Sequence, residues 1–392
     1  MSFLCAARAA LVGQSVLRRI LPLVAVVILA GLSLSCGNSS HGTPTGPNHN
    51  AYVTLPQKGS VLLLHINGTT GAITLGAQTP QVQDTTPTGL ALLPSKKFLY
   101  AVNSFANTIS IFNVASDGTL TLTGTPTQAG GSSPNAAVID PSGKYLLVTN
   151  NLTDNVSVFS IDSGSGALSP VGSPVPANAN PAEILITPSG KFVYVTNPGI
   201  GMVTAFTFSN GVLTEVKPGS PFFSGAGAFG LAVDGSERFL YVANPSASNP
   251  PPSSTTGNIS GFNIDPSTGA LTTQILGSPF TATNGSLPSA IAVDPSGRYV
   301  YATTAGSSFS IWCFSITSTN GQLVAVPNSP FSLTSGGLFA LFDPSGNYFY
   351  IGSSGSNGIA GYTYNPSTGA PTVISGSPFS TGTPPGKMVL SE

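Results

Sequence analysis

Side chains that could do acid–base chemistry are few in this sequence. After residue 50 there is one histidine, His65, and there are two arginines, Arg238 and Arg298. Two other charged residues, Glu183 in NPAEILI and Lys387 in PPGKMVL, stand directly before short apolar runs. A carboxylate can act as a general base, and an ammonium can stabilise a developing oxyanion. Glu183 and Lys387 are therefore the candidate catalytic residues, with hydrolysis as the chemistry they could perform.

Other reaction classes leave no trace in the sequence. It has no Gly-x-Ser-x-Gly elbow, no paired histidines for zinc, no acidic calcium loop and no glycine-rich phosphate loop followed by Lys and Ser or Thr. We therefore expect no metal and no cofactor. Charged residues make up 6% of the chain and the net charge is −1, which argues against nucleic acid as a partner.

Most of the remaining charges belong to turns. Asp140 opens a DPSG turn, in which Asp bonds the backbone, Pro presets φ and Gly closes the turn. The same position is held by Asp234, Asp294 and Asp343. A second, outer set of turns opens with Asp117, Asp162 and Asp265. Turn formation alone explains all of these aspartates, and we predict structural roles for them.

These turns recur because the chain is a repeat. The last residue of each YVTN-like run, which we call the register residue, recurs at spacings of 47 to 60 residues. The register residues are Leu55, Asn103, Asn150, Asn197, Asn244, Thr304 and Ser353. Each copy contains four strand-length runs rich in β-branched and aromatic residues, separated by turn signals. Seven copies of this size are typical of propeller blades.

The two ends of the repeat region complement each other. The first copy opens at AYVTL, the second strand of a unit, and the last segment, PPGKMVLSE, supplies only a first strand. Pairing of the C-terminal strand into the first blade would close the ring and remove a free sheet edge. The sequence predicts an all-β, seven-bladed β-propeller of four-stranded antiparallel blades over residues 51–392.

Three motifs carry a family resemblance. The runs DPSGRYVYATT (residues 294–304), TGAL (268–271) and GSPF (277–280) resemble the YVTN-type propellers. More closely, they are similar to the lactonase family that includes bacterial 6-phosphogluconolactonases and fungal carboxymuconate cycloisomerases. The resemblance implies His, Arg and Glu side chains on the channel face. That set does not transfer to this chain, in which Glu183 alone is a candidate base.

The starts of the innermost strands define the channel mouth. Five of the seven aligned residues are apolar or glycine, and Glu183 and Lys387 break the pattern. The aligned residues are Gly89, Ala136, Glu183, Gly230, Ala290, Phe339 and Lys387. Blades four and one lie nearly opposite each other, so a direct ion pair would need a narrow channel. The two charges are either solvated at the channel mouth or in contact with a ligand.

A binding face is expected where the loops are uneven. Asp154, in NLTDN, follows a second strand, and the longest loop of this kind spans residues 245–258. The predicted binding residues are Asp154, Asn150, Asn197 and Asn244. The alternative is that the long loop is only a tolerated surface insertion.

The N-terminal segment predicts export. Arg18 and Arg19 precede an apolar run over residues 20–34, and LSLSC ends in Cys36, which resembles a bacterial lipoprotein cleavage site. We expect residues 1–36 to be a signal peptide, Cys36 to carry lipid in the cell envelope, and residues 37–50 to be a flexible tether. Plain cleavage to a secreted or periplasmic protein is the alternative. Cys313, in SIWCFSI, is expected to be a buried, inert thiol.

Two functions are compatible with these observations. The first is a monomeric, non-catalytic scaffold that binds an envelope protein or a neutral glycan, and the scarcity of catalytic side chains favours it. The second is a lactone hydrolase acting outside the cytoplasm, with Glu183 as base and Lys387 as electrostatic aid. Such an exported enzyme would not meet cytosolic 6-phosphogluconolactone.

Overall fold

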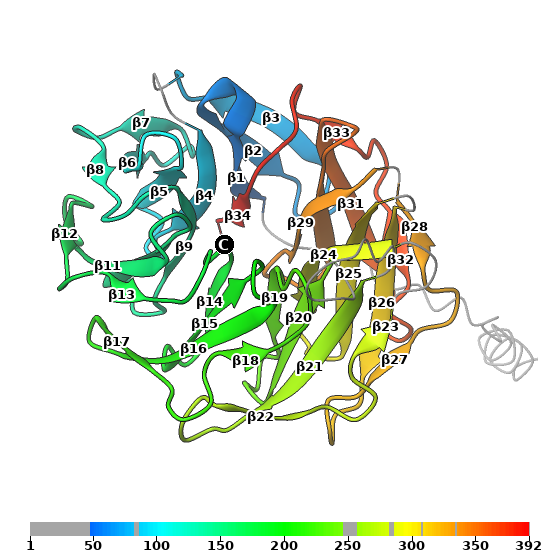
Figure 1. The fold of residues 1–392 in the computed structure, drawn as a ribbon. Helices are drawn as coiled ribbons and strands as arrows, with labels where there is room; N and C mark the ends of the chain where they lie inside the picture. The colour runs from blue at the N-terminus through cyan, green and yellow to red at the C-terminus, as the bar shows by residue number, and fades with distance from the viewer. Residues whose placement is uncertain are drawn as a thin grey trace, which may run out of the picture. The chain divides into compact units, whose positions relative to one another are not determined.

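Seven β-sheets surround a central axis in the computed structural model (Figure 1). The structure describes residues 48–81, 86–245, 257–281, 286–306, 309–333 and 335–391. Each sheet contains one four-stranded antiparallel blade, and the blades follow one another around the ring in chain order. The predicted all-β, seven-bladed propeller is therefore confirmed.

Four strands make each blade, and they follow one another from the channel outward. Blade 1 contains β34 (Met388–Leu390), β1 (His49–Leu55), β2 (Ser60–Ile66) and β3 (Ile73–Gln78). Blade 2 contains β4 (Pro87–Leu92), β5 (Phe98–Asn103), β6 (Thr108–Val114) and β7 (Leu120–Leu122). Blade 3 contains β9 (Pro134–Ile139), β10 (Tyr145–Asn150), β11 (Asn155–Ile161) and β12 (Leu168–Pro170). Blade 4 contains β14 (Ile184–Ile186), β15 (Phe192–Asn197), β16 (Met202–Ser209) and β17 (Val212–Glu215).

The second half of the ring repeats the pattern. Blade 5 contains β19 (Gly230–Val233), β20 (Phe239–Asn244), β21 (Asn258–Ile264) and β22 (Leu271–Gln274). Blade 6 contains β24 (Ser286–Val293), β25 (Tyr299–Gly306), β26 (Ser310–Ile316) and β27 (Leu323–Ala325). Blade 7 contains β29 (Gly337–Phe342), β30 (Tyr348–Ser353), β31 (Gly358–Tyr364) and β32 (Pro371–Val373). In blades 2 to 7 a short strand after the fourth pairs with the third: β8 (Thr127–Gln128), β13 (Val175–Pro176), β18 (Phe222–Phe223), β23 (Phe280–Thr281), β28 (Phe331–Ser332) and β33 (Phe379–Ser380).

The predicted turn chemistry is visible in the first turn of blade 3. Asp140 Oδ1 accepts hydrogen bonds from the backbone N–H groups of Lys144 and Tyr145, at 2.8 and 2.6 Å. Gly143 has φ of 70°, a left-handed conformation that favours glycine. The aspartates at the same position in blades 5 to 7 accept the equivalent bonds; they are Asp234, Asp294 and Asp343.

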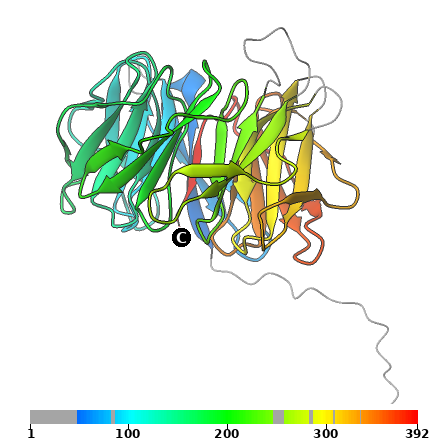
Figure 2. The same ribbon diagram turned by 60° about the horizontal axis from the view of Figure 1, so that its bottom comes forward.

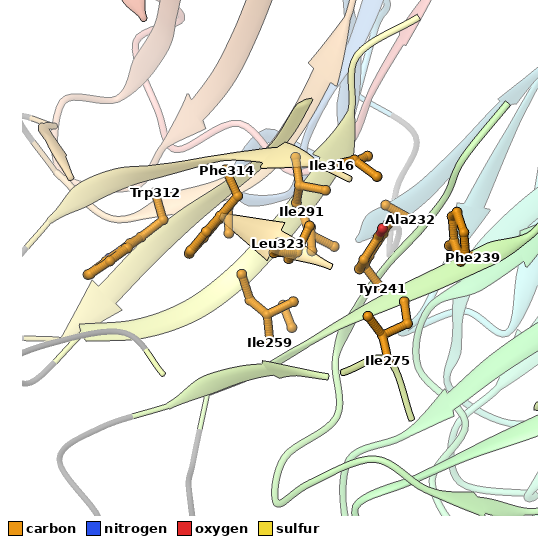
Figure 3. Close-up of a cluster of buried hydrophobic side chains, with 13 residues drawn as sticks. Ala232, Phe239, Tyr241, Ile259, Ile275, Ile291, Trp312, Phe314, Ile316 and Leu323 are labelled. Carbon is orange, nitrogen blue, oxygen red and sulfur yellow. The ribbon is translucent and has the colours of Figure 1, made fainter. Parts of the chain in front are cut away.

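The core lies between neighbouring blades. Figure 3 shows one such cluster, in which Tyr241 and Ile259 of blade 5 pack together with Ile291, Phe314 and Leu323 of blade 6. The rings of Trp312 and Phe314 stack with their centroids 5.8 Å apart. Because each sheet is covered by apolar side chains on both faces, hydrophobic burial between sheets holds the ring together.

A tyrosine on the second strand links six of the blades to the next. Tyr194 Oη donates to the carbonyl of Gly269, in the outer turn of blade 5, at 2.9 Å. The equivalent pairs are Tyr52–Gly118, Tyr100–Gly166, Tyr241–Gly321, Tyr301–Gly369 and Tyr350–Gly71. Blade 3 has Leu147 at this position, and it faces blade 4, whose outer turn between β16 and β17 contains only Asn210 and Gly211.

The C-terminal strand closes the ring as predicted. β34 pairs with β1 in the register Ala51↔Leu390 and Val53↔Met388. Strand β1 begins at His49, so His49 and Asn50, which we expected in the tether, belong to the first blade. Cys36 and the expected signal peptide lie outside the described residues. Within the described ranges, no helix has the length and hydropathy to cross a membrane.

Candidate functional site

The propeller has two distinct faces, seen edge-on in Figure 2. We call one the link face: it carries the links between blades and the turns between second and third strands, which hydrogen-bond to each other at Asn151 N–Ser133 O, 3.0 Å apart. The opposite, turn face carries the first and outer turns. The chain enters β1 from the turn face, because His49 pairs with Ile66 beside the outer turn of blade 1.

The aligned ring at the channel mouth is confirmed by strand register. Each member lies opposite the residue that precedes a register residue, as in the pairs Gly230↔Ala243 and Ala290↔Thr303. The backbone N–H groups of Thr196 and Thr54 donate to the carbonyls of Glu183 and Lys387 in the same way, at 3.0 and 2.9 Å. All members therefore lie at one level of the channel, near the link face.

Glu183 and Lys387 meet across the channel. Lys387 Nζ donates to Glu183 Oε2 at 2.6 Å, and the two side chains are 34% and 21% exposed, with the lysine the more exposed. Glu183 comes from blade 4 and Lys387 from blade 1, so the pair divides the channel, with blades 2 and 3 on one side and blades 5 to 7 on the other. From the sequence, a direct ion pair between blades 4 and 1 was expected to need a narrow channel. The two charges are in direct contact, so the channel is narrow enough at this level.

A threonine hydroxyl fixes the backbone of each charged residue. Glu183 N donates to Thr196 Oγ1 at 3.1 Å, and Lys387 N donates to Thr54 Oγ1 at 2.8 Å. Thr196 Oγ1 also donates to the Phe229 carbonyl of the next blade at 3.0 Å. Both threonines are fully buried. The sequence analysis did not predict a role for these threonines. Their shared position, third in the YVTN-like run, could have indicated it.

A cavity of about 140 Å³ adjoins the ion pair, on the side of blades 5 to 7. Among the described residues, Glu183 and Lys387 are the only charged ones that line it. The remaining lining comes from the inner strands and their links: Phe229, Gly230, Leu231, Ser289, Ala290, Ile291, Leu338, Phe339, Ala340, Leu341 and Met388. Leu338 is 41% exposed at this mouth. The arrangement places a carboxylate and an ammonium on the wall of a small cavity that is lined by both polar and apolar groups.

The predicted binding residues lie elsewhere on the link side. Asp154, at φ of 54°, is exposed and accepts from Asn180 N at 2.7 Å, so it holds the link that leads to Glu183. The three asparagines have no exposed surface. Asn150 Nδ2 donates to Ser157 Oγ, Asn197 Nδ2 to the Ala177 carbonyl and Asn244 Nδ2 to Asn258 Oδ1, all within 2.7 to 2.8 Å. They therefore form no part of the site at the ion pair. Of the long loop, residues 246–256 lie outside the described residues.

His65 and both arginines lie away from the channel mouth. His65 Nδ1 is 2.9 Å from Asn50 Oδ1, beside the outer turn of blade 1. Arg238 donates to the Ser318 carbonyl on the turn face, at 2.8 Å, and Arg298 bonds the Pro366 carbonyl in the same way. Cys313 is buried, and burial raises the pKa of its thiol to about 12, which keeps it protonated and unreactive. Among the described residues no three His, Cys, Asp or Glu side chains gather as a metal site.

The fold and the channel-mouth site define a seven-bladed propeller whose candidate chemistry lies where the inner strands begin. The model of the family described as "Lactonase, 7-bladed beta-propeller" matches residues 41–180, 173–275 and 254–384. The chain therefore belongs to the lactonase family of seven-bladed β-propellers, and the resemblance read from the repeats is confirmed.

Solved structures share this fold at low sequence identity. A putative 6-phosphogluconolactonase from Bacteroides uniformis is 19% identical, with a TM-score of 0.73 over 88% of this chain and 100% of that one. Another, from Bacteroides fragilis, is 20% identical, with a TM-score of 0.73 over 90% and 100%. The Pseudomonas aeruginosa periplasmic gluconolactonase is 18% identical, with a TM-score of 0.68 over 88% and 99%. No curated protein matches the chain.

Proposed function

We propose that this protein hydrolyses a lactone at the channel mouth, with Glu183 as general base and Lys387 as the group that stabilises the oxyanion. The observation that carries the proposal is the 2.6 Å contact between the only carboxylate and the only ammonium among the described residues that line the cavity. Membership of the lactonase family and the fold shared with a periplasmic gluconolactonase support it. The sequence alone favoured a scaffold because catalytic side chains are scarce in it.

The reaction uses the pair as follows. Glu183 takes a proton from a water molecule as the water oxygen bonds to the lactone carbonyl carbon. Negative charge develops on the carbonyl oxygen beside the Lys387 ammonium, which stabilises it. Collapse of this intermediate breaks the ring C–O bond, and the leaving alkoxide takes the proton from Glu183. The product is an open-chain hydroxy acid, and both side chains return to their starting state.

An indicator assay of acid release by the full chain tests the reaction. The panel contains neutral sugar lactones and aliphatic lactones. We expect turnover by the wild type and a loss of about 10²- to 10⁴-fold in Glu183→Gln, because removal of a general base has effects of this size. Asp162→Asn is the control, since that carboxylate lies in the outer turn of blade 3, outside the cavity. Absence of turnover by the wild type, or equal rates in wild type and Glu183→Gln, would contradict the proposal.

The place of action is proposed to be outside the cytoplasm, with lipid on Cys36 as the anchor. Arg18 and Arg19, the apolar run over residues 20–34 and the LSLSC sequence support this proposal. Metabolic labelling with a radioactive fatty acid should label the wild type and leave Cys36→Ser unlabelled. Equal labelling of the two would contradict anchoring at Cys36, and export without labelling would favour the secreted or periplasmic alternative.

A second candidate function is a non-catalytic scaffold that binds an envelope protein or a neutral glycan. It is favoured by Phe105 and Leu152, which are 75% and 69% exposed at matching turn positions of neighbouring blades on the link face. Exposed apolar residues grouped in this way are typical of interaction sites. The double variant Phe105→Ser/Leu152→Ser should retain fewer envelope proteins or neutral glycans than the wild type, and identical retention would contradict this function.

A further inference from the structure

The cavity beside the ion pair is lined by both polar and apolar groups. Glu183, Lys387 and Ser289 are polar, and the apolar wall consists of Leu231, Ile291 and Leu341, on the inner strands of blades 5, 6 and 7. Leu338, at the start of β29, is 41% exposed, so an apolar surface also faces solvent at this mouth. A ligand that covers this wall gains free energy from burial of its own apolar surface.

The electrostatics of the cavity oppose a charged ligand. Lys387 is the only cation among the described lining residues, and its ammonium is already paired with Glu183. Phosphate groups are usually held by several Arg, Lys or backbone N–H donors. A phosphorylated ligand would have to compete with Glu183 for Lys387, and the carboxylate would repel it.

The cavity itself is small. Its volume of about 140 Å³ is well below the range of about 300 to 1,000 Å³ found for sites that hold drug-sized molecules. A single small ring with a short substituent suits this volume, and an alkyl substituent is the part of a ligand that the leucine and isoleucine side chains would bind.

We propose that the site takes an uncharged, non-phosphorylated lactone whose alkyl substituent lies against Leu231, Ile291 and Leu341. The reaction in this statement rests on the proposed function, but the ligand class rests on the cavity alone. The two are separable, because a lactam of the same shape binds without being hydrolysed.

Calorimetric titration of the full chain with lactams tests the ligand class. The probes are δ-valerolactam, its 6-propyl derivative and glucono-δ-lactam. Each buried methylene contributes about a fourfold gain in affinity, so the propyl derivative should bind up to about fiftyfold more tightly than valerolactam. Glucono-δ-lactam has no alkyl group to cover the apolar wall and should bind more weakly than the propyl derivative.

Matched variants locate the apolar wall. Leu341→Ser should lower the affinity for the propyl lactam by about tenfold or more, whereas Val138→Ser should not, because Val138 holds the same strand position in blade 3 but does not line the cavity. Both side chains are half-buried. Leu338→Ser is a second variant, which should fold because Leu338 is exposed, and Leu276→Ser is its control because Leu276 is exposed and does not line the cavity.

The outcomes separate the two proposals. Lactam binding with the expected preference, together with no lactone hydrolysis, would leave the ligand class intact and remove the proposed reaction. The ligand class would be overturned by glucono-δ-lactam binding as tightly as the propyl lactam. Failure of all three lactams to bind, or equal effects of Leu341→Ser and Val138→Ser, would overturn it as well.

Discussion

The aspartates of the outer turns accept hydrogen bonds from backbone N–H groups, and these bonds stabilise the ionised carboxylates. Asp162 Oδ1 accepts from the N–H groups of Gly164 and Ser165, and Asp265 Oδ1 from those of Ser267 and Thr268. The hydroxyls of Thr119 and Ser165, which bond Asp117 and Asp162, and the backbone N–H groups of all three turns lower the pKa of Asp117, Asp162 and Asp265 below the ordinary value of 3.8. A carboxylate whose pKa is lowered on folding stabilises the fold above its unfolded pKa, and this contribution is lost as pH falls.

The triple variant Asp117→Asn/Asp162→Asn/Asp265→Asn tests the role of these carboxylates. It should fold, because Asn365 accepts the same turn bonds, from Ser367 N at 2.8 Å and Thr368 N at 3.2 Å. Its melting temperature should fall less than that of the wild type between pH 6 and pH 3, since the amides do not titrate. Circular dichroism at both pH values measures the difference, and an equal fall in the two proteins would contradict this role.

Thr196 is a positioning residue, because its hydroxyl accepts from the N–H of Glu183 at 3.1 Å. Thr196→Val should reduce kcat at least tenfold with little change in KM. Thr79→Val is the matched control, since the buried Thr79 Oγ1 accepts from Val61 N at 3.0 Å in blade 1, away from the cavity lining. Both variants should lose about 1 kcal/mol of stability. Equal kcat values in the two variants would show that the Thr196 hydroxyl has only a structural role.

Residue identity predicted the turns and singled out the two charges, but not their contact. Asp140 and its equivalents form the expected turns because a DPSG sequence determines its own local geometry. The Glu183–Lys387 distance depends on the width of the channel, which is set by how seven sheets pack. The buried amides of Asn150, Asn197 and Asn244 were equally hidden, because their partners lie on neighbouring strands and links.

At the scale of elements, the tyrosine bonds between blades are a source of stability. Tyr194→Phe removes the donor to the buried Gly269 carbonyl and should lower the free energy of unfolding by about 1–3 kcal/mol. Tyr145→Phe is the control, because within the described ranges its ring packs beside Phe208 and Gly211 with no hydrogen bond from its hydroxyl to a neighbouring blade. Chemical denaturation measures both variants, and equal losses would mean that the bond contributes nothing specific.

Ring closure is the second prediction at this scale. Deletion of residues 386–392 removes β34, its pairing with Ala51–Val53 and the buried Met388 side chain. Loss of that side chain alone costs about 1.5–3 kcal/mol, and the lost hydrogen bonds add to it, so the melting temperature should fall sharply. Removal of Ser391 and Glu392 alone is the control, because it keeps β34 and loses only the hydrogen bond from Ser391 N to the Asn50 carbonyl among those that the structure describes. Similar melting temperatures for the two truncations would contradict the closure.

The strands and their pairing were the features that the sequence predicted most completely. Alternating aromatic and aliphatic runs between regular turns gave the strands, and the incomplete units at the two ends gave the closing pair of β1 and β34. Small errors arose at a boundary, where His49 and Asn50 extend β1 beyond its expected start. Polar residues at a strand end carry little pattern, so pairing with β2 decides their conformation.

At the scale of the whole molecule, the site arises where near-identical blades differ. The ring positions of the five remaining blades carry glycine, alanine or phenylalanine, and only blades 4 and 1 carry charges there. Because these blades lie across the channel from each other, one ion pair both spans the ring and bounds a cavity against blades 5 to 7. We therefore expect Glu183 and Lys387 to act as one functional unit.

A double-mutant cycle on lactone hydrolysis tests that claim most directly. It compares kcat/KM of the full chain with that of Glu183→Gln, Lys387→Met and the double variant. Residues that act as a unit give strongly non-additive losses, so the double variant should be about as slow as Glu183→Gln alone. Losses that add, or rates unaffected by either substitution, would contradict the claim. The ion pair would then have only a structural role across the channel.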